Sequence, residues 1–145
     1  GYTVVMTRSS NDGLYANGAS NKKRSDMEKR RQIIDGAKPD LVVSIHQNYY
    51  PLGSVKGAQV FYGKDSETGR EYASVMQTVL NNSLGSNRVS KTGDYFVLNC
   101  TPYPSLLIEC GFLSNAEEEK LLVKATYQKK IAYAVFGAIH SLLGA

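Results

Sequence analysis

Apolar and polar residues follow one another along the chain in blocks that predict strands and helices in turn. The runs at residues 41–46 and 105–110 are apolar almost throughout, which favours central strands buried on both faces. Shorter runs rich in β-branched or aromatic residues predict further strands at residues 2–7, 57–62 and 95–98. Apolar residues at helical spacing predict helices at residues 25–37, 66–84, 116–122 and 126–145.

Local end signals support these helices and together suggest a fold class. Ser25 followed by Glu28 forms a capping box that begins the first helix, and Asn115 caps the short acidic helix after it. Because strands alternate with helices, we expect an α/β fold with a twisted, mostly parallel sheet flanked by helices. The length of 145 residues fits a single domain.

Composition narrows the class of protein only a little. The net charge of +4 suits anionic partners such as nucleic acid or bacterial wall polymers. The basic residues gather at positions 22–31, but Asp26 and Glu28 interrupt them, which favours a solvated helix face. Cys100 and Cys110 lie in or beside apolar segments, which favours buried filler and leaves a single disulfide open. No apolar run is long enough to span a membrane.

Two polar residues close apolar strands and are the candidates for chemistry. His46 ends the run at residues 41–46, and Glu109 nearly ends the run at residues 105–110. In α/β sheets, ligands gather beyond the carboxyl ends of strands, so the pair could combine a metal ligand with a general base. A hydrogen-bonded structural histidine and a glutamate paired with lysine remain open as alternatives. His140 lies among apolar residues of the last helix, where a packing or surface role is favoured.

The ordered set of motifs resembles the zinc-dependent N-acetylmuramoyl-L-alanine amidases of type 3. Residues 44–48, S-I-H-Q-N, resemble that family's S-I-H-x-N strand end, and residues 108–115 resemble its E-x-G-F-x-S-N motif. Weaker matches stand in the family's order at residues 6–8, 57–62 and 95–98, the last followed by Pro104. The compact loops resemble the sporulation-type members more than those with long regulatory insertions.

The resemblance implies a function and a role for each residue. His46 would be a zinc ligand, and Glu109 would be the catalytic glutamate that hydrolyses the amide between N-acetylmuramic acid and L-alanine. Asn48 and Asn115 would bind substrate carbonyls or simply cap turns. The resemblance implies zinc as cofactor, peptidoglycan rather than nucleic acid as partner, no membrane span, and a place in the bacterial cell envelope or outside the cell.

One departure from the family concerns the metal site. The family's other two zinc ligands, a histidine in a D-P-G-H-G-G turn and a glutamate on the first helix, precede the strand expected at residues 2–7. We therefore expect residues 1–145 to be the larger C-terminal part of the catalytic domain, without its first strand and helix. Two alternatives remain: an inactive wall-binding or regulatory module of the same fold, and an unrelated α/β domain that binds nucleic acid through residues 22–31.

Overall fold

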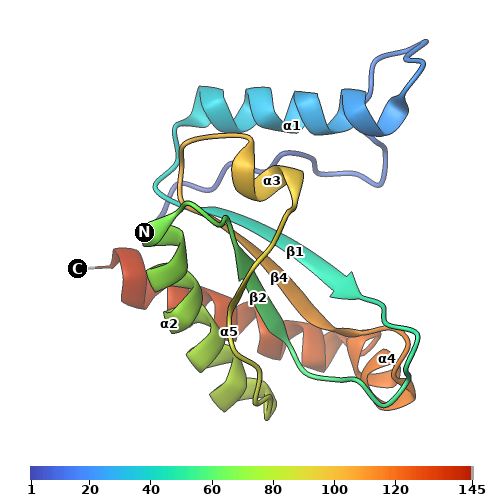
Figure 1. The fold of residues 1–145 in the computed structure, drawn as a ribbon, viewed down its shortest axis with the longest axis vertical. Coiled ribbons are helices and arrows are strands. Elements are labelled where there is room, and N and C mark those ends of the chain that lie inside the picture. Colours follow the sequence, from blue (N-terminus) through green and yellow to red (C-terminus); the bar gives the residue numbers. More distant parts are fainter. Residues whose placement is uncertain (145) are drawn as a thin grey trace.

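The computed structural model describes residues 1–144, which form a four-stranded sheet with helices on both sides (Figure 1). The strand order is β1-β4-β2-β3. Along the chain the elements are α1 (Lys22–Ala37), β1 (Val42–Asn48), β2 (Gln59–Tyr62), α2 (Glu67–Leu84), β3 (Lys91–Thr92), α3 (Phe96–Asn99), β4 (Ser105–Phe112), α4 (Ala116–Leu122) and α5 (Ala125–Leu143). The predicted α/β class with flanking helices is confirmed.

The sheet is mixed rather than uniform in direction. β1 pairs with β4 in parallel and β2 pairs with β3 in parallel, whereas β2 runs antiparallel to β4. The antiparallel step follows from the connection between β1 and β2, which contains no helix and returns the chain in the opposite direction. The sheet is therefore mixed rather than mostly parallel, with two strands in each direction and an antiparallel pairing that the apolar pattern did not indicate.

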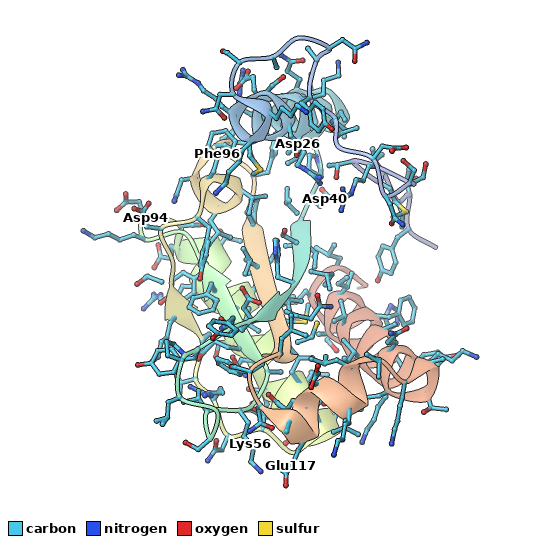
Figure 2. All side chains as sticks on the ribbon, turned by 90° about the vertical axis from the view of Figure 1, so that its right-hand side faces the viewer. Asp26, Asp40, Lys56, Asp94, Phe96 and Glu117 are labelled. Carbon is cyan, nitrogen blue, oxygen red and sulfur yellow. The ribbon has the colours of Figure 1, made fainter. Side chains whose placement is uncertain are left out.

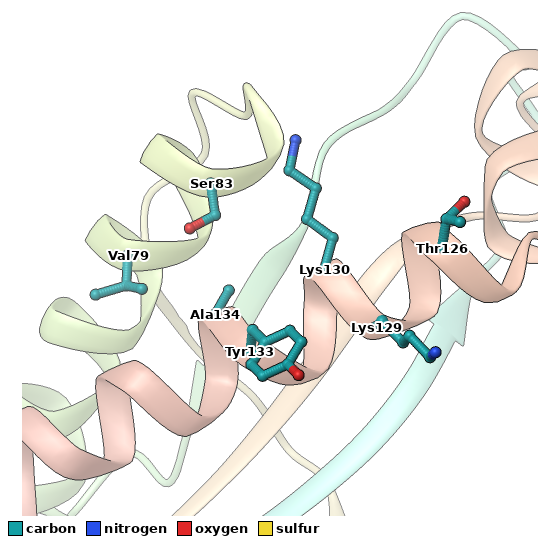
Figure 3. A pocket seen from close by; sticks show the side chains of 7 residues that line it. All are labelled: Val79, Ser83, Thr126, Lys129, Lys130, Tyr133 and Ala134. Atoms are coloured by element: carbon teal, nitrogen blue, oxygen red, sulfur yellow. The ribbon is translucent and has the colours of Figure 1, made fainter.

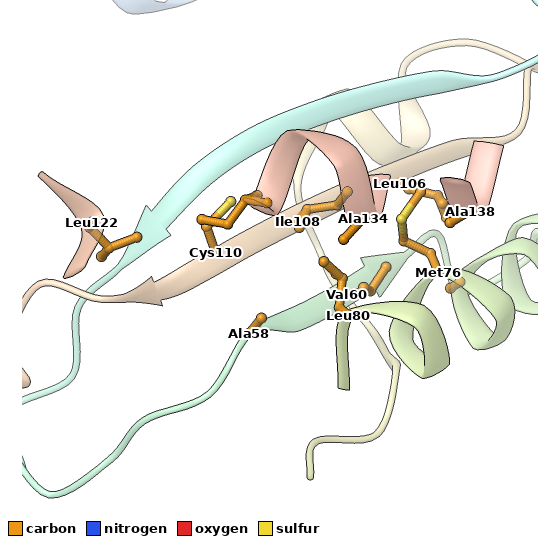
Figure 4. Packing of buried hydrophobic residues seen from close by; sticks show 12 residues of the cluster. Ala58, Val60, Met76, Leu80, Leu106, Ile108, Cys110, Leu122, Ala134 and Ala138 are labelled. Carbon is orange, nitrogen blue, oxygen red and sulfur yellow. The ribbon is translucent and has the colours of Figure 1, made fainter. Parts of the chain in front are cut away.

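One face of the sheet, here called the core face, is closed by α2 and α5 (Figure 4). Side chains alternate along a strand, so Leu106 and Ile108 of β4 enter this face together with Val60 of β2. Burying each such side chain contributes about 1.5–3 kcal/mol relative to leaving it in water. The buried cluster comprises Ala58, Val60, Ala73, Met76, Leu80, Leu106, Ile108, Cys110, Leu122, Ile131, Ala134 and Ala138.

The other face, here called the polar face, carries Ser44, His46, Gln59, Leu107 and Glu109. These residues are partners in register: Ser44 faces Leu107, and both His46 and Gln59 face Glu109 from the two neighbouring strands. α1 and α3 lie on this side, above the sheet in Figure 1. The alternation of β4 therefore separates the apolar side chains of Leu106 and Ile108 from Glu109 and its polar neighbours.

The strand predicted at residues 2–7 is wrong. Within residues 1–144 this segment pairs with no strand, although Tyr2 Oη lies 2.9 Å from His140 Nδ1 and Arg30 donates to Thr7 Oγ1 at 3.0 Å. Val4, between these two anchored ends, is 77% exposed. A strand needs a neighbour for its N–H and C=O groups, so β propensity alone does not produce one here.

The strand predicted at residues 95–98 is also wrong, because this segment forms the short helix α3. The two-residue strand β3 precedes it, and Gly93 N–H donates to Tyr62 C=O at 2.9 Å beyond the pairing of β3 with β2. A four-residue apolar run does not distinguish a strand from a buried helical turn. Here Leu98 is the residue that the turn buries.

The capping box expected at Ser25 and Glu28 is not formed. α1 begins three residues earlier, where Asn21 Oδ1 accepts from Arg24 N–H at 2.9 Å. Ser25 Oγ accepts instead from Ala16 N–H at 3.0 Å, which fastens the preceding loop to the helix. Asparagine is as good a cap as serine, so the first of two suitable residues begins the helix.

The remaining helices begin and end close to the predicted positions. Ser66 caps α2, and Gly85 ends it in the left-handed conformation that favours glycine. Asn115 Oδ1 accepts from the N–H groups of Glu117 and Glu118 at the start of α4, as predicted. None of the helices described between residues 1 and 144 combines the length and apolar character that crossing a bilayer requires.

Both cysteines are free thiols. Cys110 lies in the core, where burial first and the negative charge of Glu109 second raise the pKa of its thiol to about 11. A thiol with such a pKa stays protonated and unreactive at neutral pH. The filler role is confirmed for Cys110, and the disulfide that the sequence left open is not formed.

Candidate active site

His46 and Glu109 meet on the polar face. They are Cα partners in the parallel pairing of β1 with β4, so their side chains leave the sheet on the same side. Neighbouring strands lie about 4.8 Å apart, which brings an imidazole and a carboxyl within reach of one small molecule. The register shifts between His46 and Asn48, a local irregularity of the kind that re-aims a side chain near a site.

Glu109 is a buried carboxyl with an unused oxygen. The residue is 7% exposed, and its Oε2 has no hydrogen-bond partner within residues 1–144. Burial raises the pKa of this carboxyl above its ordinary value, because the charged form loses water. Leaving a buried polar atom unpaired costs about 1–3 kcal/mol. Such a cost is characteristic of groups kept for proton transfer or ligand binding.

His46 is held in a neutral, available state. Its Nε2 lies 2.9 Å from Ser44 Oγ, two residues earlier on the same face of β1. Partial loss of water around the ring is the larger cause that lowers the pKa of His46, and the positive charge of Arg30 is the second. The residue as a whole is exposed, so a ligand can approach it. A neutral imidazole is the form that binds metals.

His46 is not part of a complete metal cluster in the described part of the chain. Residues 1–144 contain no group of three or more histidine, cysteine, aspartate or glutamate side chains placed to hold a metal ion. His140 lies on α5, where Tyr2 contacts its Nδ1 and Phe136 stacks on its ring at 6.2 Å between centroids. His140 is exposed and packs against these two rings, so the packing or surface role predicted for it is what the structure shows.

Three further residues border Glu109 and were not singled out from the sequence. Gln59 is buried, faces Glu109 in register, and donates through Nε2 to Val89 C=O. Phe61, two residues along β2, packs edge-on against Tyr95 at 5.4 Å between ring centroids. Burial, and secondarily the negative charge of Glu109, raise the pKa of the Tyr95 hydroxyl. Gln59 had a usable signal, since it is the one polar side chain in the run at residues 58–62.

The two asparagines expected to bind substrate or cap turns lie beside the pair, at the carboxyl ends of β1 and β4. Asn48 Oδ1 accepts from Tyr49 N–H at 2.8 Å, and Asn48 C=O accepts from Leu113 N–H at 2.8 Å. Asn115 is buried, and its Nδ2 donates to Gly53 C=O at 2.8 Å. These bonds shape the turns around the site, and substrate binding by either asparagine stays a prediction.

A separate hollow of about 560 Å³ lies between α2 and α5, on the helices that cover the core face (Figure 3). Val79 and Ala134 form its floor, and Lys129, Lys130 and Tyr133 stand around it. The sheet separates this hollow from His46 and Glu109. The candidate chemistry therefore lies on the polar face and not in the hollow.

Known proteins share this sequence and this fold. The sequence model of the family described as N-acetylmuramoyl-L-alanine amidase matches residues 1–141. A germination-specific N-acetylmuramoyl-L-alanine amidase of Bacillus subtilis (strain 168) is 36% identical in an alignment that covers 96% of this chain and 61% of that protein. The amidase LytC of the same strain is 30% identical in an alignment that covers 86% of this chain and 27% of LytC.

Solved structures agree with the fold. The CwlD amidase of Clostridioides difficile, determined in complex with the GerS lipoprotein, matches with a TM-score of 0.91 and 35% identity over 97% of this chain and 75% of that one. The catalytic domain of CwlV from Bacillus (Paenibacillus) polymyxa matches with a TM-score of 0.84 and 26% identity, over 98% of this chain and 73% of that one. Sequence and structure thus show that the chain belongs to the N-acetylmuramoyl-L-alanine amidase family.

Proposed function

We propose that the protein to which this chain belongs hydrolyses the amide bond between N-acetylmuramic acid and L-alanine in peptidoglycan. The observation that carries the proposal is the buried carboxyl of Glu109, whose free Oε2 lies on the polar face beside His46. Relatives known as N-acetylmuramoyl-L-alanine amidases support the same bond. Their envelope substrate supports a location in the cell envelope or outside the cell.

Glu109 carries the proton in this mechanism. Its carboxylate takes a proton from the water whose oxygen attacks the amide carbonyl carbon. The same proton then goes to the amide nitrogen as the carbon–nitrogen bond breaks and the L-alanine amine leaves. A raised pKa suits both steps, because the group accepts and releases a proton at neutral pH more readily than an ordinary glutamate. The amide is unactivated, so its amine leaving group requires this proton.

Zinc is the cofactor that the family resemblance implies, and His46 is the ligand that we assign to it. A bound zinc would lower the pKa of its water to about 7. Catalytic zinc requires three protein ligands, and the described residues supply only His46, so they do not by themselves fit a complete zinc site. We therefore infer that two further ligands come from residues outside this 145-residue chain.

Two unpaired segments support a larger catalytic domain. β1 is one of the two edge strands of the sheet, and its Ile45 is 52% exposed. The extended residues 2–7 also lack a strand partner within residues 1–144. An additional strand beside β1 would cover this apolar edge and satisfy its backbone groups. We propose that the full domain supplies such a strand and, with it, the remaining ligands.

The test is Glu109→Gln in a longer protein that holds the whole zinc site. Release of peptides beginning with L-alanine should fall at least about 100-fold, because the proton carrier is lost. Zinc content should not change. Glu117→Gln is the matched control, since Glu117 is exposed and pairs only with Lys56 at 3.0 Å. Peptide release at the normal rate by the Glu109 variant would remove the proposed base.

The second candidate function is that of an inactive wall-binding module, which the incomplete ligand set within residues 1–144 favours. The two candidates separate when the longer protein is incubated with zinc and intact peptidoglycan. Binding without any release of peptide would support the module. Zinc-dependent release would support the amidase.

A further inference from the structure

The loop that follows β1, residues 49–58, is here called the rim loop. It leaves the sheet directly after the strand that carries His46, so it borders the candidate site. Tyr49 and Tyr50 on this loop are 71% and 52% exposed, and Leu52 is exposed as well. Residues 47–55 contain no charged side chain, although 21% of the chain is charged. The first part of the loop, up to residue 55, therefore offers uncharged, aromatic surface beside the site, and Lys56 follows near its other end.

Side chains from the β4–α4 turn hold the backbone of the rim loop in place. Tyr50 N–H donates to Ser114 Oγ at 3.0 Å, and Asn115 Nδ2 donates to Gly53 C=O at 2.8 Å. A Cβ on Gly53 would lie 3.1 Å from the carbonyl oxygen of Ser114, which shows how closely the two segments approach. These contacts fix the half of the loop that carries the tyrosines.

Glu118 anchors the other end of the rim loop. It is buried, and its two oxygens accept from Gly57 N–H at 2.9 Å and from Phe112 N–H at 2.7 Å. Gly57 has a φ of 103°, a conformation that favours glycine. Nearby, Lys56 pairs with Glu117 at the end of the molecule away from α1 (Figure 2). One buried carboxylate thus joins the loop to the end of the strand that carries Glu109.

A fixed backbone that presents exposed aromatic rings is suited to binding. Removing the apolar surface of an exposed ring from water is favourable, so such rings are suited to contact a ligand. A preformed loop also loses little conformational entropy when the ligand binds. The face of a tyrosine ring packs against apolar surfaces, while its hydroxyl group remains hydrated. A sugar ring is complementary to it, because its C–H groups form an apolar face and its hydroxyl groups lie around the edge. The absence of charged side chains from residues 47–55 favours a neutral ligand over an anionic or cationic one.

We propose that the rim loop is a sugar-binding platform on which Tyr49 and Tyr50 stack against the N-acetylated sugars of a glycan strand. The inference rests on the proposed function, because the strand is the one whose stem peptide reaches Glu109. Ser114, Asn115 and Glu118 act as positioning residues that hold the platform in its binding shape.

The experiment measures binding rather than catalysis, so it uses the 145-residue chain itself. Neutral oligomers of N-acetylglucosamine, which carry the N-acetylated sugar without peptide or carboxylate, are titrated into the wild type, Tyr49→Ala and Tyr50→Ala. Each variant should bind about 3- to 10-fold more weakly, as loss of one aromatic contact implies. Tyr133→Ala is the matched control, because Tyr133 is 75% exposed on α5 beside the hollow and away from the site. It should bind as the wild type does.

Glu118→Gln tests the positioning claim with both tyrosines in place. One carboxylate oxygen becomes an NH₂ group that faces a backbone N–H donor, so one anchor is lost. Glycan affinity should fall, and hydrogen exchange at the Gly57 amide should quicken. Glu119→Gln, at an exposed position on the same helix, should change neither.

The outcomes separate this inference from the proposed function. Unchanged glycan affinity in both tyrosine variants, or no glycan binding by the wild type, overturns the platform and leaves the role of Glu109 to its own test. Tyrosine variants that weaken binding of free stem peptide but not of peptide-free glycan also overturn it, because the loop would then recognise peptide.

Discussion

The two faces of the sheet share the same strands and differ in almost every physical respect. The core face is covered by α2 and α5, and its residues Leu106 and Ile108 are fully buried in an apolar cluster. The polar face carries a buried glutamate with an unused oxygen and a neutral histidine that a ligand can approach. Stability is thus concentrated on one side of β4 and chemistry on the other, although the side chains involved are neighbours in sequence.

The largest expected effect comes from removing apolar volume on the core face. Ile108→Ala should lower the free energy of unfolding by about 2–5 kcal/mol, because it removes buried contacts and leaves a cavity. Urea denaturation of the 145-residue chain measures this loss. Ile45→Ala is the matched control: Ile45 is the register partner of Ile108 on β1 but is exposed, so its loss should cost well under about 1 kcal/mol. Equal losses would contradict the described division between the faces.

On the polar face, a substitution of Glu109 is expected to raise the free energy of unfolding rather than lower it, and by a smaller amount. Burial raises the pKa of Glu109 above its ordinary value of 4.5, so the folded protein holds this proton more tightly than the unfolded chain. Its contribution to stability is therefore present below pH 4.5 and is lost as the pH rises through the raised pKa. Glu109→Gln lacks this loss and should be more stable than the wild type at neutral pH, by about 1–3 kcal/mol.

Urea denaturation at about pH 4 and about pH 7 measures the difference in free energy of unfolding between Glu109→Gln and the wild type. This difference should be larger at about pH 7. The exposed Glu117→Gln serves as control and should follow the wild type at both. A gap that narrows as the pH rises would mean that the carboxylate of Glu109 is stabilised in the fold.

The smallest effect concerns His46, whose pKa is lowered first by loss of water and second by the charge of Arg30. Arg30→Gln should raise the pKa of His46 part of the way toward the ordinary histidine value of 6.5. Titration of the imidazole by NMR in the 145-residue chain measures this change. Arg31→Gln is the control, because it removes one positive charge from the neighbouring residue. The side chain of Arg31 pairs with Glu28 and Asp35. If both variants shift the titration equally, the influence of Arg30 is not specific.

The elements that depend on a local pattern of residues could be predicted from the sequence. Continuous apolar runs identified β1 and β4, and with them the juxtaposition of His46 and Glu109. Two predicted strands were wrong although their residues favour β structure. Residues 2–7 have no neighbouring strand among the described residues, and residues 95–98 lie largely in the helix α3. A strand is completed by its partner, which its own residues do not encode.

Features that depend on distant contacts were also beyond the sequence. Glu118 is one of three consecutive glutamates, and nothing in that run marks it as the one that is buried and bonded to Gly57 and Phe112. Gln59 became notable only once β2 was placed antiparallel to β4 and opposite Glu109. Such roles arise from strand order and loop closure, which periodicity does not determine.

The strict alternation of β4 has a consequence for errors in folding. If the strand slipped by one residue against its neighbours, Glu109 would enter the apolar cluster and Ile108 would take its place on the polar face. A molecule with this fault would lose its catalytic candidate and much of its stability together. Cellular proteases recognise unstable chains, so they would also remove molecules that cannot act on their substrate. Degradation of molecules with this misfolded strand would therefore also remove molecules with a defective candidate site.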